Sequence, residues 1–279
     1  DPLLQANMLL LQERIPKASI FHAHASEFAD IRTAASVPSV PVRVLNNPDT
    51  PLPEVRLLSN GRYHVMVTNV GGGYSRWKDY AVTRWREDTT RDHWGAFCYI
   101  RDLASGEFWS NTHQPTLKAA DRYAAIFSEG RAEFRRRDHD YDTHTDIVVS
   151  PEDDIELRRI RITNRSRLRR TIEVTSYAEV VLASSAADAM HPAFSNLFAQ
   201  TEILPQRQAI LCTRRPRAFT EPTPWMLHLL TMHEGEASEV SYTTDRAQFI
   251  GRGNTLVAPN AMTAVGDLAG RQGAVLDPI

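Results

Sequence analysis

The chain has 279 residues, of which 42% are hydrophobic and 24% are charged, and its formal net charge at pH 7 is −2. This balance is that of a globular protein with a sizeable core, and it excludes a disordered chain and a strongly basic nucleic-acid-binding protein. No apolar run approaches the roughly 20 residues that a membrane helix needs, and residues 1–11 lack the basic start of a signal peptide.

Residues 1–16 predict a short helix, because apolar side chains recur at steps of three and four until Pro16 ends the pattern. Residues 17–53 have no sustained period, and prolines gather in their second half, which predicts a linker. Such a start is typical of the terminal helix of a preceding domain, followed by its connection to the next one.

Residues 54–265 predict an all-β domain, because the hydrophobic period changes to two. Asn60-Gly61 predicts the turn of a first hairpin, and residues 104–106 predict the turn of a second one between strands at 97–102 and 107–110. A third hairpin is expected between residues 155–162 and 171–182, with a possible bulge at Arg158-Arg159.

The rest of this domain continues the same pattern. Further strands are expected at 196–204, 208–213 and 225–232, with a helix near 186–190. Many strands separated by turns favour a large antiparallel sandwich. Residues 266–279 are polar and rich in glycine, which predicts the start of another linker.

Several residue patterns could carry chemistry. Cys98 and Cys212 are isolated and predict buried free thiols. Histidines and aspartates gather at 138–146, where they could catch a divalent cation, although a solvated loop is the simpler interpretation. Arginines gather at 158–170, and acidic neighbours favour charge pairing across strands over nucleic-acid binding. We find no catalytic pair of carboxylates, no metal-ligand spacing and no cofactor motif.

The sequence resembles the N-terminal sandwich of the cellobiose-phosphorylase family, glycoside hydrolase family ninety-four. The matching blocks are residues 58–63, 67–75, 99–102 and 108–115, and blocks at 191–198 and 245–253 are similar to the version in cyclic β-1,2-glucan synthases. The resemblance implies a super-sandwich like that of galactose mutarotase. In such proteins it precedes an (α/α)6 barrel that holds the catalytic aspartate and the phosphate site.

The resemblance also implies which residues touch sugar. By position, residues 72–77 and 128–131 match loops at the rim of the sugar site, so the substrate-binding candidates are Gly73, Tyr74, Ser75, Trp77 and Arg131. Aromatic rings suit this role because they stack on the apolar face of a sugar. The phosphorylases carry a glycine- and histidine-bearing loop at the second position, where this chain has Ser128-Glu129-Gly130-Arg131.

Three functions remain open at this point. The first is a non-catalytic domain that supports the barrel, its expected partner in the same polypeptide, with a β-glucan oligosaccharide and a homodimer as further options. The second is an aldose mutarotase, which would use a histidine acid and a glutamate base. The third is an assembly module without sugar contact. The resemblance implies a cytoplasm-facing domain, with an inner-membrane protein as one option for its parent.

Overall fold

The structure is a computed structural model, and it describes residues 41–263 apart from 89, 217, 220, 234–236 and 238. The described residues lie in one compact unit, 40–279. The predicted helix 1–16, the first part of the predicted linker and the predicted linker 266–279 lie outside the described residues.

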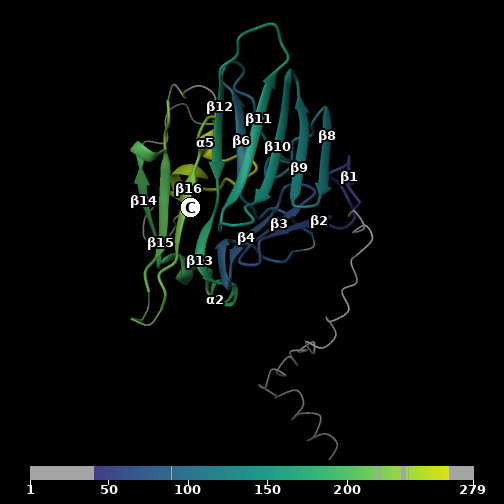
Figure 1. The fold of residues 1–279 in the computed structure, drawn as a ribbon. Coiled ribbons are helices and arrows are strands. Elements are labelled where there is room, and N and C mark those ends of the chain that lie inside the picture. The colour runs from purple at the N-terminus through teal and green to yellow at the C-terminus, as the bar shows by residue number, and fades with distance from the viewer. Residues whose placement is uncertain are drawn as a thin grey trace, which may run out of the picture. The chain divides into compact units, whose positions relative to one another are not determined.

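The described part is built almost entirely of antiparallel strands (Figure 1), which confirms the predicted all-β class. The strands are β1 (Arg43–Leu45), β2 (Val55–Ser59), β3 (Tyr63–Thr68), β4 (Gly73–Trp77), β5 (Tyr80–Thr83), β6 (Phe97–Asp102), β7 (Phe108–Ser110), β8 (Arg122–Ser128), β9 (Arg131–Asp138), β10 (Tyr141–Val149), β11 (Glu156–Asn164), β12 (Ile172–Tyr177), β13 (Val180–Ser184), β14 (Ala199–Leu204), β15 (Ala209–Arg214) and β16 (Trp225–Leu229). The helices are α2 (Ser185–Met190), α3 (Pro192–Asn196), α4 (Arg246–Phe249), α5 (Asn260–Thr263) and a 3-10 turn at Pro205–Arg207.

The strands form four sheets. Sheet A has the order β1-β8-β9-β10-β11, sheet B β13-β5-β4-β3-β2, sheet C β12-β6-β7 and sheet D β14-β15-β16. Sheets A and B pack face to face around a core that includes Leu58, Val65, Phe127 and Phe134. This packing follows from the period of two, because alternate residues of each strand turn the same face inward.

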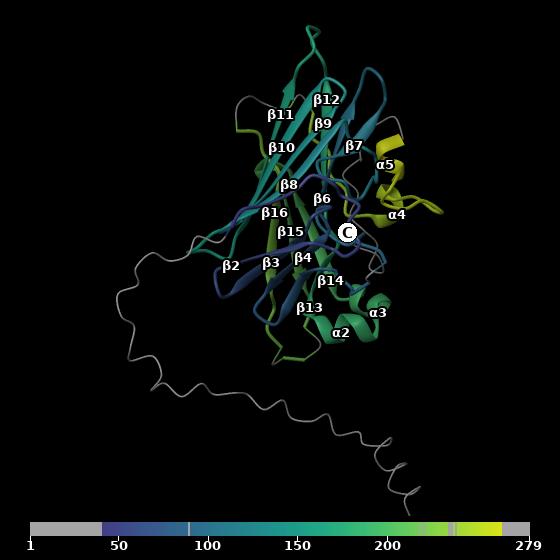
Figure 2. The same ribbon diagram turned by 90° about the vertical axis from the view of Figure 1, so that its right-hand side faces the viewer.

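Sheet C joins this core through a second cluster. Ile100 and Trp109 of sheet C pack against Tyr141 of sheet A, while the opposite face of sheet C packs Tyr99 against Phe249 of α4. Figure 2 shows α4 and α5 beside β6 and β7. Sheet D packs Cys212 against Val180 and Leu182 of β13. Cys98 and Cys212 are buried and unbridged, as the sequence predicts.

The first two predicted hairpins are confirmed. In the β2–β3 turn, the side-chain oxygen of Asn60 accepts hydrogen bonds from the backbone N–H groups of Arg62 and Tyr63. Gly61 adopts a φ of +88°, which glycine reaches without the steric cost of a side chain. The β6–β7 hairpin pairs Tyr99 with Ser110. The strands predicted near 199–229 and the helix near 186–190 are also present.

The third predicted hairpin is wrong. β11 pairs with β10 in sheet A, whereas β12 pairs with β6 in sheet C, so the segment between them crosses from one sheet to another. The proposed bulge at Arg158-Arg159 is also wrong, because β11 pairs with β10 in continuous register. As a consequence Glu156 and Arg158 share the inner face with Ile160, and Leu157 faces solvent with 57% of its surface exposed.

β1 lies within the stretch 17–53 that the sequence predicts as linker. It pairs with β8 at the edge of sheet A, and Leu45 packs against the core between sheets A and B. A strand of three residues between prolines gives too short an alternation for its period to be recognised. The helices that the structure describes are all short, and none has the length and apolar character that a bilayer crossing requires.

Candidate functional site

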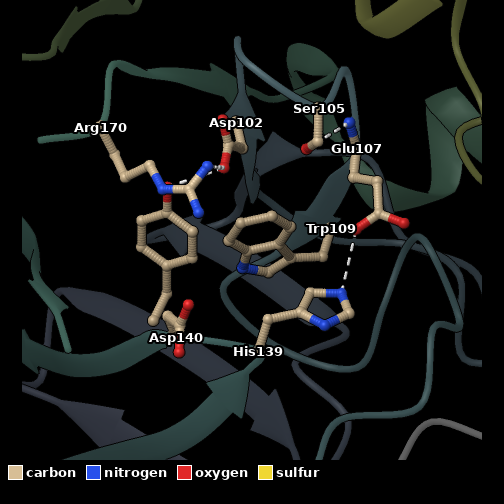
Figure 3. A pocket seen from close by; sticks show the side chains of 8 residues that line it. Asp102, Ser105, Glu107, Trp109, His139, Asp140 and Arg170 are labelled. Atoms are coloured by element: carbon tan, nitrogen blue, oxygen red, sulfur yellow. Dashed lines mark hydrogen bonds and ion pairs between the residues drawn. The ribbon is translucent and has the colours of Figure 1, made fainter. Parts of the chain in front are cut away.

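A small pocket of about 180 Å³ opens where two turns meet the β11–β12 connection at one end of sheets A and C (Figure 3). The β6–β7 turn and the β9–β10 turn form two of its sides, and Arg170, just before β12, forms a third. Its lining residues are Asp102, Ser105, Glu107, Trp109, His139, Asp140, Tyr141 and Arg170. The pocket therefore gathers hydrogen-bonding side chains around one buried indole.

The inner end of the pocket is a fixed acid–phenol pair. Asp102 Oδ2 accepts a hydrogen bond of 2.9 Å from the Tyr141 hydroxyl, and Asp102 Oδ1 accepts one from the Ala104 N–H. Burial alone would raise the pKa of Asp102, but these hydrogen bonds hold it below its usual value. Burial and the Asp102 hydrogen bond raise the pKa of Tyr141 to about 12. Near neutral pH this end therefore holds one carboxylate and one neutral phenol.

The indole of Trp109 forms a wall of the pocket. It is 3% exposed, and its ring lies 5.3 Å from that of Tyr141, centroid to centroid. Figure 3 shows the indole nitrogen on the side where Asp140 and His139 lie. In the described part of the chain this buried N–H has no hydrogen-bond partner. Most buried polar atoms do have a partner, so the Trp109 N–H is an exception among the buried groups of the domain.

The outer rim of the pocket is an exposed ion-pair contact. His139 Nε2 lies 3.0 Å from Glu107 Oε2, and both side chains are more than half exposed. Arg170 approaches from the other side, with its Nη1 atom 3.7 Å from Asp102 Oδ2. The pocket thus presents three carboxylates, one guanidinium and one imidazole.

A wider groove of about 1020 Å³ crosses the outer face of sheet A. It includes residues of the predicted cation-binding stretch 138–146, most of which is strand β10 rather than a loop. Arginines of β9, of β11 and of the residue that follows β11 pair with carboxylates of β10: Arg137 and Arg165 with Asp142, and Arg159 with Asp146. Charge pairing across strands, which the sequence favours, is therefore present here, although its carboxylates come from β10.

One group in this groove region has the spacing of metal ligands. Atoms of Glu133, His144 and Asp146 lie within 4.8 Å of one another. Arginines already neutralise both carboxylates, because Arg135 contacts Glu133 at 2.6 Å and Arg159 contacts Asp146 at 2.7 Å. A divalent cation would have to displace these arginines, so the group fits an ion-pair network better than a metal site.

The structure does not bring the five predicted sugar-binding residues together, and none of them lines the pocket. Gly73 is buried in β4, and a Cβ atom there would lie 1.8 Å from the Met66 carbonyl oxygen. Ser75 is 2% exposed and donates a hydrogen bond to Glu156. Residues 73–77 form a strand rather than the expected loop. Gly73 and Ser75 pair with β3 and lie on the buried face of β4.

Tyr74 and Trp77 lie on opposite faces of β4, because an odd separation in a strand reverses the side. Tyr74 packs edge-on against Trp85 on the outer face of sheet B, at 5.5 Å between ring centroids. Trp77 donates from its Nε1 atom to Asp154 Oδ2, and its ring lies tilted beside that of Tyr80. The two rings therefore cannot grip one sugar together.

Arg131 lies at the start of β9, directly after the two-residue turn of the β8–β9 hairpin. Its guanidinium reaches Glu133 at 3.4 Å and Asp146 at 3.5 Å, so it belongs to the ion-pair network on the outer face of sheet A. Its side chain is 47% exposed, which leaves one side open to solvent.

Sequence reasoning missed a polar cluster inside the sandwich. Glu156 Oε2 accepts hydrogen bonds from Ser75 and Tyr63, while Glu156 Oε1 accepts one from Arg158. Burial, reinforced by the Glu156 charge, raises the pKa of Tyr63. Charged residues at inward positions look like solvent-facing residues in a sequence, so only the register of β11 reveals them.

Comparison with known proteins gives one family. The family model for the glycosyl hydrolase 94 supersandwich domain matches residues 39–279. Cyclic beta-(1,2)-glucan synthase NdvB of Rhizobium meliloti (strain 1021) is 37% identical over 280 residues, which cover 100% of this chain and 10% of that protein. The chain therefore spans about a tenth of that relative's length.

Two phosphorylases are more distant relatives. N,N'-diacetylchitobiose phosphorylase of Vibrio furnissii is 29% identical over 57% of this chain and 20% of its own length. Solabiose phosphorylase of Paenibacillus borealis is 28% identical over 50% of this chain and 19% of its own length. With the antiparallel sandwich and the family match over residues 39–279, the chain belongs to the glycosyl hydrolase 94 supersandwich domain family.

Proposed function

We propose that this chain is a non-catalytic, carbohydrate-associated domain of a cyclic β-1,2-glucan synthase or glycoside phosphorylase, where it supports an (α/α)6 barrel that acts on β-glucan. The observation that carries this proposal is the alignment of the whole chain with a tenth of a cyclic β-1,2-glucan synthase. In this proposal the barrel belongs to the same polypeptide, and the domain faces the cytoplasm of a parent that resides in the inner membrane.

An apolar face on sheet D supports a scaffold role. Trp225, Leu227 and Leu229 alternate along β16 and are 63%, 56% and 53% exposed. Among the described strands β16 is also an edge strand of its sheet, and an edge strand can pair with a further partner. Exposed apolar rows of this kind mark contact surfaces. We assign this face to the barrel, because most of the length of the relatives lies outside the stretch they share with this chain.

The geometry gives the mutarotase alternative no support. That chemistry needs an acid and a base on two sides of a sugar ring. His139 contacts Glu107 at 3.0 Å and His144 contacts Glu133 at 2.8 Å, so neither pair leaves space for a sugar ring between its acid and its base. Arg135 also neutralises Glu133.

The first experiment asks whether the chain alone turns over sugar. The purified chain is incubated with β-1,2-gluco-oligosaccharides and phosphate, and separately with α-glucose, while phosphorolysis and anomer interconversion are followed. We expect no turnover above the uncatalysed rate. Turnover of either kind would show that the chain is an enzyme in its own right.

The second experiment tests the scaffold role in the full polypeptide that carries this domain. Leu227→Glu is expected to lower its thermal stability and its glucan-processing activity, because a charge would be buried at the contact with the barrel. Leu57→Glu is the matched control, since Leu57 is 65% exposed on β2, an edge strand of sheet B. Sedimentation of the isolated chain completes the test, because a dimer that Leu227→Glu dissociates would assign the face to self-association instead.

A further inference from the structure

The outer face of sheet A carries more arginine than acid. On or beside it, five arginines share three carboxylates: Arg131, Arg135, Arg137, Arg159 and Arg165 pair with Glu133, Asp142 and Asp146. Arg122 and Arg161 also line its groove, are exposed and form no ion pair in the described part of the chain. Asp121 adds one carboxylate to the groove. This face therefore has an excess of positive charge, although the formal net charge of the whole chain is −2.

The strand register places like charges directly opposite one another. Arg122 of β8 is the pairing partner of Arg137 of β9, and Arg135 lies two residues before Arg137 on the same face. Like charges at opposed positions destabilise an antiparallel pair of strands. A bound anion would offset this repulsion, so the face is suited to a negatively charged ligand.

Two of these arginines flank a shorter side chain. His144 of β10 is the pairing partner of Arg135 on β9 and of Arg161 on β11, so the three side chains form one row across the sheet. Figure 1 shows these three strands side by side. The Cα atoms of the two arginines are about 10 Å apart, because two strand spacings separate them. The row therefore has a long guanidinium side chain at each end and an imidazole as its floor, and all three residues line the groove of about 1020 Å³.

Both guanidinium groups of this row are open to a ligand. Arg161 is exposed and makes no hydrogen bond with any described residue. The Arg135 side chain is 62% exposed, and it donates to Glu133 through Nε, so its two Nη groups have no hydrogen bond within the described residues. Glu133 also contacts Arg131 and His144, so it offsets only part of the charge of Arg135. Donors at both ends of the row therefore face the solvent of the groove.

The chemistry of the row favours a phosphoryl group. A guanidinium fork matches the oxygens of a phosphate or a carboxylate. The two forks approach from opposite sides, so the ligand must present acceptor oxygens in both directions. A phosphoryl group has three acceptor oxygens and a charge of about −1.5 to −2 near pH 7. A carboxylate has two oxygens in one plane and a single charge, so it matches the row and its charge excess less well.

We propose that Arg135 and Arg161 bind a phosphoryl group above His144, on the outer face of sheet A. The groove extends beyond this row toward Arg122 and the loop at residues 46–48, which leaves space for the rest of a phosphorylated ligand. This assigns a binding site to the sandwich itself, and the inference does not rest on the proposed function.

The experiment titrates the chain with sodium phosphate by calorimetry in about 0.1 M sodium chloride, where the Debye length is about 10 Å. We expect saturable binding with a millimolar Kd. Arg161→Gln removes one fork and should weaken binding about tenfold. The variant should fold normally, because Arg161 is exposed and unpaired among the residues that the structure describes.

Arg122→Gln is the matched control. It removes the same charge from the same face, but three strand spacings, or about 14 Å, separate β8 from β11. Because this distance exceeds the Debye length, Arg122→Gln should weaken phosphate binding by less than about twofold. Equal weakening by Arg122→Gln and Arg161→Gln would overturn the inference, because the anion would then be held by diffuse charge and not by the row.

Glucose 6-phosphate in the same titration separates two sources of the phosphoryl group. Tighter binding than that of inorganic phosphate would assign the site to a phosphorylated sugar, and equal binding would assign it to free phosphate. Arg161→Gln should weaken both. Absence of saturable binding for both compounds would overturn the inference. Tighter binding of a hexaglutamate peptide would also overturn it, since the face would then fit an acidic protein segment.

Discussion

Ser75 Oγ donates a hydrogen bond of 2.5 Å to Glu156 Oε2 and so joins sheet B to sheet A through the interior of the sandwich. The same carboxylate receives the Tyr63 hydroxyl and the Arg158 guanidinium. The Glu156 side chain is 11% exposed, and a largely enclosed carboxylate that holds three donors fixes the relative register of two sheets, because any slip would leave a charge unpaired. Ser75 thus contributes to the core of the domain rather than to a sugar surface.

Ser75→Ala tests this interior role. Removal of the hydroxyl leaves Glu156 with one donor fewer, so we expect the free energy of unfolding to fall by about 1–3 kcal/mol. Chemical denaturation at pH 7 measures the loss. Ser241→Ala, at an exposed position, should change stability by less than about 0.5 kcal/mol. A Ser75→Ala protein of wild-type stability with weakened sugar binding would instead restore Ser75 as a ligand-contacting residue.

Gly73→Ala should prevent or greatly weaken folding. Gly73 has a φ of +147°, and the added Cβ would lie 1.8 Å from the Met66 carbonyl oxygen, which is backbone and cannot swing away. Gly61→Ala is a matched control, because Gly61 also has a positive φ but open space around it. The control should lose about 1–2 kcal/mol from backbone strain alone. Thermal unfolding by circular dichroism compares them, and equal losses would contradict the close backbone approach.

A buried ion pair should dominate the stability of the α2 region. Arg84 donates from Nε and Nη2 to the two carboxylate oxygens of Asp188, and both side chains are less than a tenth exposed. Asp188→Asn leaves the guanidinium partly uncompensated and should cost about 3 kcal/mol. Asp79→Asn breaks the exposed pair with Arg76 and should cost less than about 0.5 kcal/mol. Denaturant unfolding curves of the two variants give the comparison, and similar midpoints would refute it.

The sequence predicts features of this fold that local interactions decide. Asn60-Gly61 and the short β6–β7 turn are recognisable because the residues that form each hairpin are neighbours in the chain. The partner of β12 is not recognisable, because its pairing with β6 joins residues seventy to eighty positions apart. Only the three-dimensional register shows that the segment after β11 changes sheets.

The pocket was harder to predict than the fold. Its walls come from segments near 105, 139 and 170, and no local motif links them. The family resemblance implies a loop at residues 72–77, in which neighbouring side chains can converge. Once the segment is a strand, the odd spacing of Tyr74 and Trp77 places them on opposite faces. The resemblance predicts the family, whereas the position of the pocket follows only from the three-dimensional structure.

The outer face of sheet A should make stability depend on pH in the acid range. The pKa of Asp142 is lowered from 3.8 to about 2. The hydrogen bond from Arg137 has the largest effect, burial acts in the opposite direction, and the hydrogen bond from Arg165 adds to the lowering. A carboxyl whose pKa is lower in the folded state stabilises that state above the unfolded pKa. This contribution is lost as the pH falls from about 4 through about 2.

Asp142→Asn removes this contribution, so its free energy of unfolding should change less between pH 7 and pH 3 than that of the wild type. Urea unfolding at the two pH values measures the difference. Asp153→Asn is the control, because Asp153 is exposed and its carboxylate has no ion pair in the described part of the chain; its pH dependence should follow the wild type. If Asp142→Asn kept the pH dependence of the wild type, the ion pairs of Asp142 with Arg137 and Arg165 would not stabilise the folded state. The reason would be that water and salt screen exposed ion pairs.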